Sequence, residues 1–242
     1  MAANPSDMRQ PGYVAGAVDE PTQPLRVVPG YKETAWRNPA QPLVRRPLTL
    51  SELSGPLEPA RRLSLLGGDI AGHGEQRAIG QLMHLRLRVL DEDGSAVSGA
   101  LVEIWHANAA GRYIHPNDDD HAPVDRNFYG AARLLTDESG ALLLRTVKPG
   151  AYPVPDSGGW WRPPHIHFSL FGKIWLSRLV TQMYFPDDPL NAQDRILNAP
   201  PSAEARARLI ARMLPPTEGP ADALVFEHQI VLRGRKATPA QP

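Results

Sequence analysis

The stretch Tyr152–His167 reads Y-P-V-P-D-S-G-G-W-W-R-P-P-H-I-H, and it leads directly into the largely apolar run Phe168–Phe171. Residues i and i+2 of a β-strand point to the same face, so His165 and His167 can direct both imidazoles at one ion. Ordinary strands also carry H-x-H pairs with exposed imidazoles, so the pair needs further ligands before it indicates a metal site. The stretch predicts a strand with two histidines on one face.

Prolines and glycines shape the approach to this strand. Pro163 and Pro164 hold its entry in an extended form and remove two backbone donors. Gly158 and Gly159 allow the chain to turn back. Tyr152 can then return to the pocket that the histidines face, which makes its phenol a candidate ligand.

Alternating hydrophobic residues extend the β prediction outward. Residues 83–89 alternate apolar and polar side chains, the pattern of a half-buried strand. At least seven strands are expected, at residues 83–89, 101–106, 132–136, 141–147, 165–171, 176–185 and 223–232. Short strands at close spacing with one late helix predict a mainly β protein, a two-sheet β-sandwich with long loops.

Two connections carry specific expectations. The turn Asp137–Gly140 is expected to close a hairpin between the strands at 132–136 and 141–147. A short helix in the C-terminal half is expected over Ser202–Leu214, with Ser202 as its N-cap and apolar residues along one face.

The chain is expected to divide into two parts. Residues 1–75 should form a Pro-rich N-terminal arm, with short helical turns between Leu48 and Leu66, that packs on a partner subunit. Many prolines without a sustained hydrophobic period cannot build a core of their own. Residues 76–242 should form the β-sandwich that carries the chemistry.

Composition excludes several function classes. The 242 residues carry 26 basic and 26 acidic side chains, so no net charge favours nucleic acid or an anionic membrane as partner. Cysteine is absent, which excludes disulfides and thiolate metal sites. With no signal-peptide pattern and no long apolar segment, the sequence predicts a soluble, cytoplasmic protein.

Carboxylate-based metal sites fit the histidine pair poorly. Zinc hydrolases and Fe(II) enzymes of the facial-triad type need a carboxylate beside two histidines, and the nearest one here is Asp156 in a loop. A cupin needs a glutamate three or four residues after the second histidine, where Phe171 and Gly172 stand. The cupin hypothesis therefore fails.

Tyrosine offers a different kind of ligand. A phenol has a pKa of about 10, so it ligates well where a strong cation such as trivalent iron stabilises the phenolate. Tyr152 precedes the histidines, and Tyr113 follows the strand at 101–106. Two phenolates with two neutral imidazoles would hold Fe(III) and leave one position for hydroxide.

Six segments occur along the chain in a fixed order: L-V-E-I-W-H-A-N-A-A-G-R-Y, L-T-D-E-S-G, T-V-K-P-G-A-Y-P, W-R-P-P-H-I-H-F, T-Q-M-Y-F and I-V-L-R-G. In this order and spacing they resemble the intradiol ring-cleaving dioxygenases, over roughly residues 25 to 235. An ordered set of this kind is far more specific than one H-x-H pair.

The resemblance implies a mononuclear, non-haem Fe(III) cofactor. Its ligands would be Tyr113, Tyr152, His165 and His167. Tyr113 and His167 would lie roughly in plane with hydroxide, and Tyr152 and His165 would lie on the axis.

The resemblance also implies roles around the iron. Arg162 would bind substrate and stabilise developing negative charge, and Gln182 would orient it. Tyr152 would act as a base when the catechol displaces it. Tyr31 would lie near the substrate carboxylate. One departure concerns the pocket shape, because Val154 stands where the family often has an aromatic residue.

The implied reaction is cleavage of 3,4-dihydroxybenzoate by O2 between its hydroxyl groups, giving 3-carboxy-cis,cis-muconate. The implied partner is an α subunit of the same family, in a hetero-oligomer. One alternative is a homomeric catechol or hydroxyquinol dioxygenase, whose helical N-terminal domain the Pro-rich arm does not resemble. The other is a non-catalytic partner chain, which would lack the tyrosine and histidine ligands.

Two further polar features are interpreted as structural. The segment His115–His121, H-P-N-D-D-D-H, is expected to be a solvated turn that shapes the pocket rim or a subunit contact. His106 ends a strand and is expected to be a structural histidine with satisfied hydrogen bonds.

Overall fold

The computed structural model describes residues 67–73, 75–116, 118, 120–171 and 178–241. Most of the expected N-terminal arm, with Tyr31 and the short helical turns, lies outside these residues. The division into 1–75 and 76–242 therefore stays a prediction.

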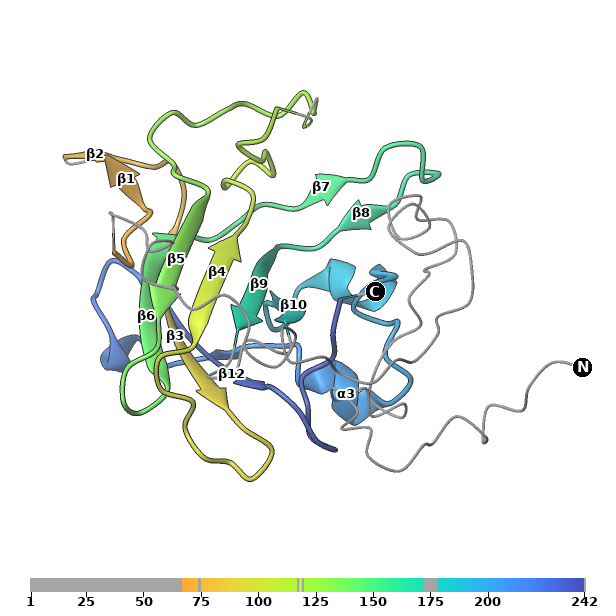
Figure 1. The fold of residues 1–242 in the computed structure, drawn as a ribbon. Coiled ribbons are helices and arrows are strands. Elements are labelled where there is room, and N and C mark those ends of the chain that lie inside the picture. Colours follow the sequence, from red (N-terminus) through yellow and green to blue (C-terminus); the bar gives the residue numbers. More distant parts are fainter. Residues whose placement is uncertain (1–66, 74, 117, 119, 172–177, 242) are drawn as a thin grey trace, which may run out of the picture.

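The first of two four-stranded sheets carries the histidine pair. Its strands are antiparallel and follow the order β10 (Arg178–Tyr184), β9 (His165–Phe171), β4 (Leu101–Trp105) and β5 (Ala131–Leu135). In Figure 1 these strands run side by side, and the loop after β4 and the β7–β8 hairpin lie toward the same upper end of the view. β9 therefore has a neighbour on each side.

The second sheet lies against the first. Its order is β11 (Arg212–Met213), β12 (Leu224–Val231), β3 (Leu82–Leu90) and β6 (Ala141–Val147), and β12 pairs with β3 in parallel. Two short ladders complete the described strands: β1 (Gly72–His73) with β2 (Gln76–Arg77), and β7 (Tyr152–Pro153) with β8 (Trp161–Arg162). The described helical segments are η3 (Pro189–Gln193), α3 (Ala203–Ala207) and η4 (Pro216–Glu218).

Both sheets contribute to one hydrophobic core. Met83, Leu85 and Leu87 of β3 are buried in the same cluster as Ile166 and Phe168 of β9. The alternation along β3 runs as the sequence predicts, with Arg86 and Arg88 exposed. The mainly β, two-sheet sandwich is confirmed.

The hairpin prediction at Asp137–Gly140 is wrong. β5 pairs with β4 in one sheet, whereas β6 pairs with β3 in the other, so the turn carries the chain between sheets. Asp137 Oδ1 accepts the N–H groups of Ser139 and Ala141, which holds a tight turn without pairing its flanking strands. Local turn chemistry does not specify which sheet each strand joins.

The predicted helix Ser202–Leu214 is shorter than expected. Ser202 caps it as predicted, its Oγ accepting the N–H of Ala205 at 3.0 Å, but α3 ends at Ala207. Beyond it the backbone pairs with Tyr184: Tyr184 N–H donates to Leu209 O, and Ala211 N–H donates to Tyr184 O. Tertiary β pairing overrides helix propensity here.

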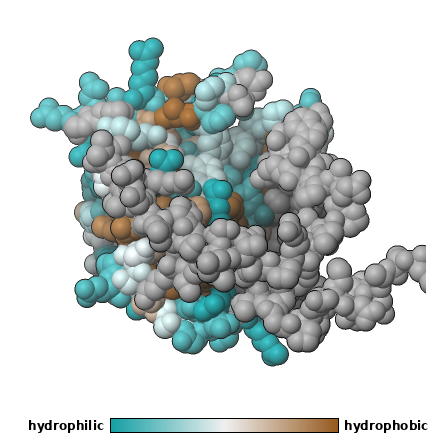
Figure 2. Space-filling view, viewed as in Figure 1, coloured by the Kyte–Doolittle hydropathy of each residue, from teal (hydrophilic) through white to brown (hydrophobic). Residues whose placement is uncertain are grey.

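No helix in the described part of the chain is both long and apolar enough to cross a membrane. On the face shown in Figure 2, hydrophilic residues dominate the coloured surface, and hydrophobic ones form small separate patches.

Candidate metal centre

The register of the first sheet surrounds the two histidines with specific neighbours. His167 on β9 pairs with Trp105 on β4 and with Gln182 on β10, while His165 pairs with Tyr184. Directly opposed residues on adjacent strands have side chains within contact distance. His165 and His167 are 2% and 8% exposed, so both imidazoles are buried.

A hairpin returns Tyr152 to this place. Gly158 and Gly159 have φ values of 74° and 86°, in the region that glycine adopts without strain. β7 then pairs with β8, with Tyr152 opposite Arg162. The turn predicted from the two glycines is confirmed.

A second loop brings Tyr113 to the same point. Asn108 Oδ1 accepts the N–H groups of Ala110 and Arg112, which folds the chain tightly after β4. Gly111 lies so close to the segment before Tyr152 that a Cβ on it would stand 2.3 Å from the Ala151 carbonyl oxygen. A glycine is therefore required where the two tyrosine-bearing segments meet.

The acidic segment after Tyr113 is organised rather than simply solvated. Asp118 is half-buried, and its Oδ2 accepts the backbone N–H of Tyr113 at 2.7 Å. Its Oδ1 lies 3.4 Å from Arg112 Nη1. That this segment shapes the pocket rim or a subunit contact stays a prediction, but Asp118 holds the backbone of Tyr113.

Four side-chain donor atoms converge. His167 Nε2 lies 3.1 Å from Tyr113 Oη and 3.2 Å from His165 Nε2. His165 Nε2 lies 3.2 Å from Tyr152 Oη and 3.5 Å from Tyr113 Oη. With metal–ligand bonds of about 2.0–2.1 Å, donors separated by about 90° to 120° stand about 2.8 to 3.6 Å apart. The separations therefore fit one shared metal ion.

The axial arrangement implied for Tyr152 and His165 stays a prediction. Their donor atoms are 3.2 Å apart, closer than the about 4 Å expected of two ligands on opposite sides of one ion. The described residues also hold no cluster of three or more His, Asp or Glu side chains suited to a metal. A metal at this point needs the phenols.

His165 is held in the tautomer and charge state that a metal ligand needs. His165 Nδ1 lies 2.7 Å from the carbonyl oxygen of Pro163, which can only accept, so Nδ1 carries the ring proton and Nε2 keeps its lone pair. Burial, reinforced by the nearby charges of Arg162 and His167, holds the pKa of His165 well below its ordinary value. A neutral imidazole is the form that ligates a metal.

Arg162 lies beside the cluster with its charge fully enclosed. It is 1% exposed, and its Nε donates to Asp194 Oδ2 at 2.9 Å. Its Nη2 donates to Gln182 Oε1 and to Tyr184 Oη, each at 2.7 Å. Burial would lower the pKa of Arg162, but electrostatic interactions with Tyr184, Tyr152 and Asp194 outweigh burial and hold that pKa well above its ordinary value. The guanidinium therefore stays positive in a fixed orientation.

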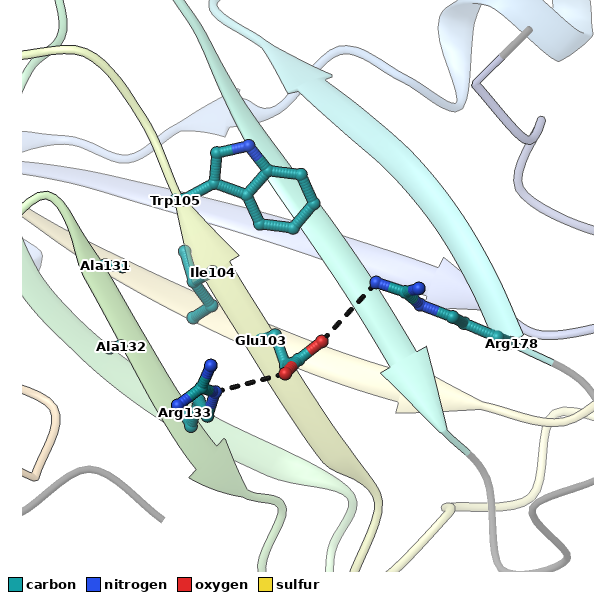
Figure 3. Close-up of a pocket in the computed structure, with 7 residues that line it drawn as sticks. All are labelled: Glu103, Ile104, Trp105, Ala131, Ala132, Arg133 and Arg178. Carbon is teal, nitrogen blue, oxygen red and sulfur yellow. Dashed lines mark hydrogen bonds and ion pairs between the residues drawn. The ribbon is translucent and has the colours of Figure 1, made fainter. Parts of the chain in front are cut away.

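Trp105 joins the cluster to a separate pocket. Its indole stacks on the His167 ring with centroids 4.9 Å apart and planes 7° apart. Trp105 also lines a pocket of 420 Å³, in which Figure 3 shows Glu103 between Arg133 and Arg178. The stack restrains the His167 ring from the side away from Gln182.

Comparison with known proteins places this arrangement in a family. A family model described as "Dioxygenase" matches residues 66–234. The protocatechuate 3,4-dioxygenase beta chain of Burkholderia cepacia is 45% identical over 225 residues, which make up 92% of this chain and 95% of that protein. The chain belongs to the intradiol ring-cleaving dioxygenases.

Other intradiol dioxygenases are more distant. The protocatechuate 3,4-dioxygenase alpha chain of Burkholderia cepacia is 31% identical over 154 residues, 62% of this chain and 72% of that protein. The solved structure of 3-chlorocatechol 1,2-dioxygenase from Rhodococcus opacus 1CP has a TM-score of 0.54 at 23% identity, covering 70% of this chain and 66% of that one. That likeness supports the sandwich fold. Intradiol dioxygenases use non-haem iron.

The structure brings the described site residues of this intradiol dioxygenase together and adds others. Tyr31 lies outside the described residues, and Val154 packs beside Trp160 and Ile196. Tyr184 is not predicted as a site residue from the sequence, although strand alternation places it on the same face as Gln182. Asp194 is likewise not predicted as a site residue, and no local sequence pattern indicates it.

The remaining histidine prediction is confirmed. His106 is fully buried, and its Nε2 lies 2.9 Å from Thr146 Oγ1 while its Nδ1 lies 2.7 Å from Ala107 O. Burial lowers its pKa to about 4. His106 is a neutral structural residue.

Proposed function

We propose that this chain is the iron-bearing subunit of an enzyme that cleaves 3,4-dihydroxybenzoate (protocatechuate) with O2 between its hydroxyl groups. The product would be 3-carboxy-cis,cis-muconate, with both atoms of O2 in the new carboxyl groups. The observation that carries the proposal is the convergence of four donor atoms, with His165 Nε2 at 3.2–3.5 Å from His167 Nε2, Tyr152 Oη and Tyr113 Oη. These four residues would hold one Fe(III).

The substrate class is supported by the relative that matches nearly the whole chain. The beta chain of Burkholderia cepacia is 45% identical and named for protocatechuate. Catalysis in this family consumes O2 and a catechol, and bound Fe(III) would supply the redox-active Lewis acid at which the two meet. The protein's own residues would bind the substrate, orient it and move its protons.

Tyr152 is suited to accept a proton from the incoming catechol. It is half-buried on a two-residue strand, and its Oη lies 3.2 Å from His165 Nε2. A catechol hydroxyl could transfer its proton to the Tyr152 phenolate as it takes that ligand's place. His165 and His167 lie on the seven-residue strand β9 and would stay in place.

Arg162 would stabilise negative charge on the substrate. Its guanidinium is held on one side by Asp194 and on another by Gln182 and Tyr184, so no reorganisation is needed as charge develops. Gln182 would act by orienting Arg162. Tyr31 would contact the substrate carboxylate, a role that rests on the sequence resemblance.

The partner would be an α chain of the same family. An alpha chain of protocatechuate 3,4-dioxygenase is also a relative of this chain, so both subunits share one ancestry. The Pro-rich N-terminal arm would pack on that partner. The active enzyme would be a hetero-oligomer of αβ units.

The visible spectrum of the iron-loaded αβ protein tests the proposal. A tyrosinate-to-Fe(III) charge-transfer band should give a red-brown colour, and 3,4-dihydroxybenzoate added without oxygen should shift it as Tyr152 is displaced. Admission of O2 should then release 3-carboxy-cis,cis-muconate. Tyr113→Phe and Tyr152→Phe should each weaken the band.

Other results would redirect or reject the proposal. An equal spectral shift and equal turnover with unsubstituted catechol would point to a catechol dioxygenase. A colourless protein after iron loading would remove the tyrosinate site and the proposed reaction with it.

A further inference from the structure

We infer that Gln241 positions His167 as an Nε2 metal ligand, by accepting the proton of the other ring nitrogen. This inference rests on the proposed metal site. Gln241 lies beyond residue 234, where the family match ends, and it stands 74 residues from His167 in the sequence. Its Oε1 is nevertheless 3.2 Å from His167 Nδ1.

The metal-facing atom of His167 is Nε2. That nitrogen contacts Tyr113 Oη and His165 Nε2, so it must keep its lone pair to ligate a metal there. A neutral imidazole carries one proton, which must then sit on Nδ1. Nδ1–H needs an acceptor to make this tautomer the favoured one.

Gln182 also lies beside His167 Nδ1, but it offers the wrong group. Its Oε1 accepts from Arg162 Nη2 at 2.7 Å, and a guanidinium cannot accept. Tyr184 Oη lies 2.5 Å from the same oxygen. The amide is therefore held with its NH2 toward His167 Nδ1, at 3.3 Å.

The two glutamines favour opposite tautomers. A donor at Nδ1 favours the form with its proton on Nε2, which cannot ligate. An acceptor at Nδ1 favours the ligating form. Gln241 Oε1 supplies that acceptor. It offsets the tautomer preference imposed by the NH2 group of Gln182, whose oxygen accepts from Arg162.

The segment around Gln241 is held firmly enough for this task. Gln241 N–H donates to Val180 O at 2.7 Å, along the outer side of the edge strand β10. Thr181 Oγ1 donates to Pro239 O at 2.6 Å, and Thr238 is 1% exposed. These bonds fix the backbone from which the Gln241 side chain reaches His167.

Metal retention by three variants of the αβ protein tests the inference. Gln241→Leu removes the acceptor and keeps the bulk of the side chain, whereas Gln241→Glu keeps an acceptor. The control is Gln229→Leu, which changes an exposed glutamine on β12. Each is loaded with iron and titrated with a chelator while the charge-transfer band and the bound iron are measured. Loss of an outer hydrogen bond to a ligating histidine typically costs about 10–100-fold in metal affinity.

We expect that loss for Gln241→Leu, with Gln241→Glu and Gln229→Leu close to wild type. Rescue by glutamate separates an acceptor from a packing role. Wild-type retention in Gln241→Leu, or equal losses in Gln241→Leu and Gln241→Glu, would overturn the inference.

A metal-free measurement separates this inference from the proposed function. In the full chain labelled with ¹⁵N-histidine, the two ring nitrogens of His167 report which one carries the proton. We expect Nδ1–H in wild type and a shift toward Nε2–H in Gln241→Leu. An unchanged tautomer would contradict the role of Gln241, whereas failure of the wild type to bind iron would reject the proposed function.

Discussion

Asp118 Oδ2 accepts the backbone N–H of Tyr113 at 2.7 Å, which ties the proposed phenolate ligand to a carboxylate five residues further along the chain. The other carboxylate oxygen accepts the N–H of Asp120 and lies beside Arg112. One side chain therefore sets the path of the loop that aims Tyr113 at the histidines.

Asp118→Ala should loosen Tyr113 and lower iron affinity by about tenfold, the lower end of what loss of an outer-shell partner costs. The matched control is Asp120→Ala, because Asp120 caps Ala122 in the same loop and makes no described bond to Tyr113. Chelator titration followed at the charge-transfer band measures both. Equal iron retention in Asp118→Ala and wild type would contradict the role.

Asp194→Asn should lower the free energy of unfolding by about 3–5 kcal/mol, because it leaves the buried Arg162 charge without its counter-charge. Both side chains are at most 1% exposed. The control is Asp91→Asn, which breaks an ion pair with Arg233 whose side chains are 28% and 53% exposed and should cost about 0–1 kcal/mol. Urea unfolding measures both, and similar losses would show that burial does not set the cost.

Arg162→Lys should lower kcat by about 10²–10³ while leaving the iron colour in place. A lysine ammonium cannot reproduce the fork that bonds Asp194, Gln182 and Tyr184 together. Steady-state kinetics with 3,4-dihydroxybenzoate and the visible spectrum give the two readings. A kcat near wild type would mean that positive charge suffices without orientation.

Stability should fall as the pH drops from about 6.5 to about 4. Burial lowers the pKa of His106 and of His228 to about 4, against an ordinary value of 6.5. The unfolded chain therefore binds protons in this window that the folded chain does not, and each histidine costs up to about 3 kcal/mol by pH 4. Above pH 6.5 both states leave these rings neutral, and the contribution vanishes.

His228→Leu isolates one of these contributions. His228 Nε2 is buried without a described partner, and its ring stacks near Phe168, so leucine should be accommodated. The variant should gain stability relative to wild type as the pH falls from 6.5 to 4. Parallel stability curves for the two proteins would assign the acid sensitivity to other groups.

Much of the fold could be predicted from local pattern. The alternation along β3 and the H-x-H on β9 each report which face is buried, since successive strand residues point to opposite sides. The pairing of β5 and β6 with different sheets was not predictable, because turn residues specify a turn and not the neighbour of each strand. The helix after Ser202 was overestimated, because its apolar face also suits backbone pairing beside Tyr184.

Local sequence patterns were sufficient to predict the sandwich, the histidine pair, the hairpin that returns Tyr152 and the family. These follow from short-range periodicity, from glycines in turns and from ordered motifs. The distant groups that complete the site are visible only in the folded chain: Asp194 beside Arg162, Trp105 against His167 and Gln241 at His167 Nδ1. Such contacts join residues 32 to 74 positions apart, and they depend on strand register and on packing that no local pattern encodes.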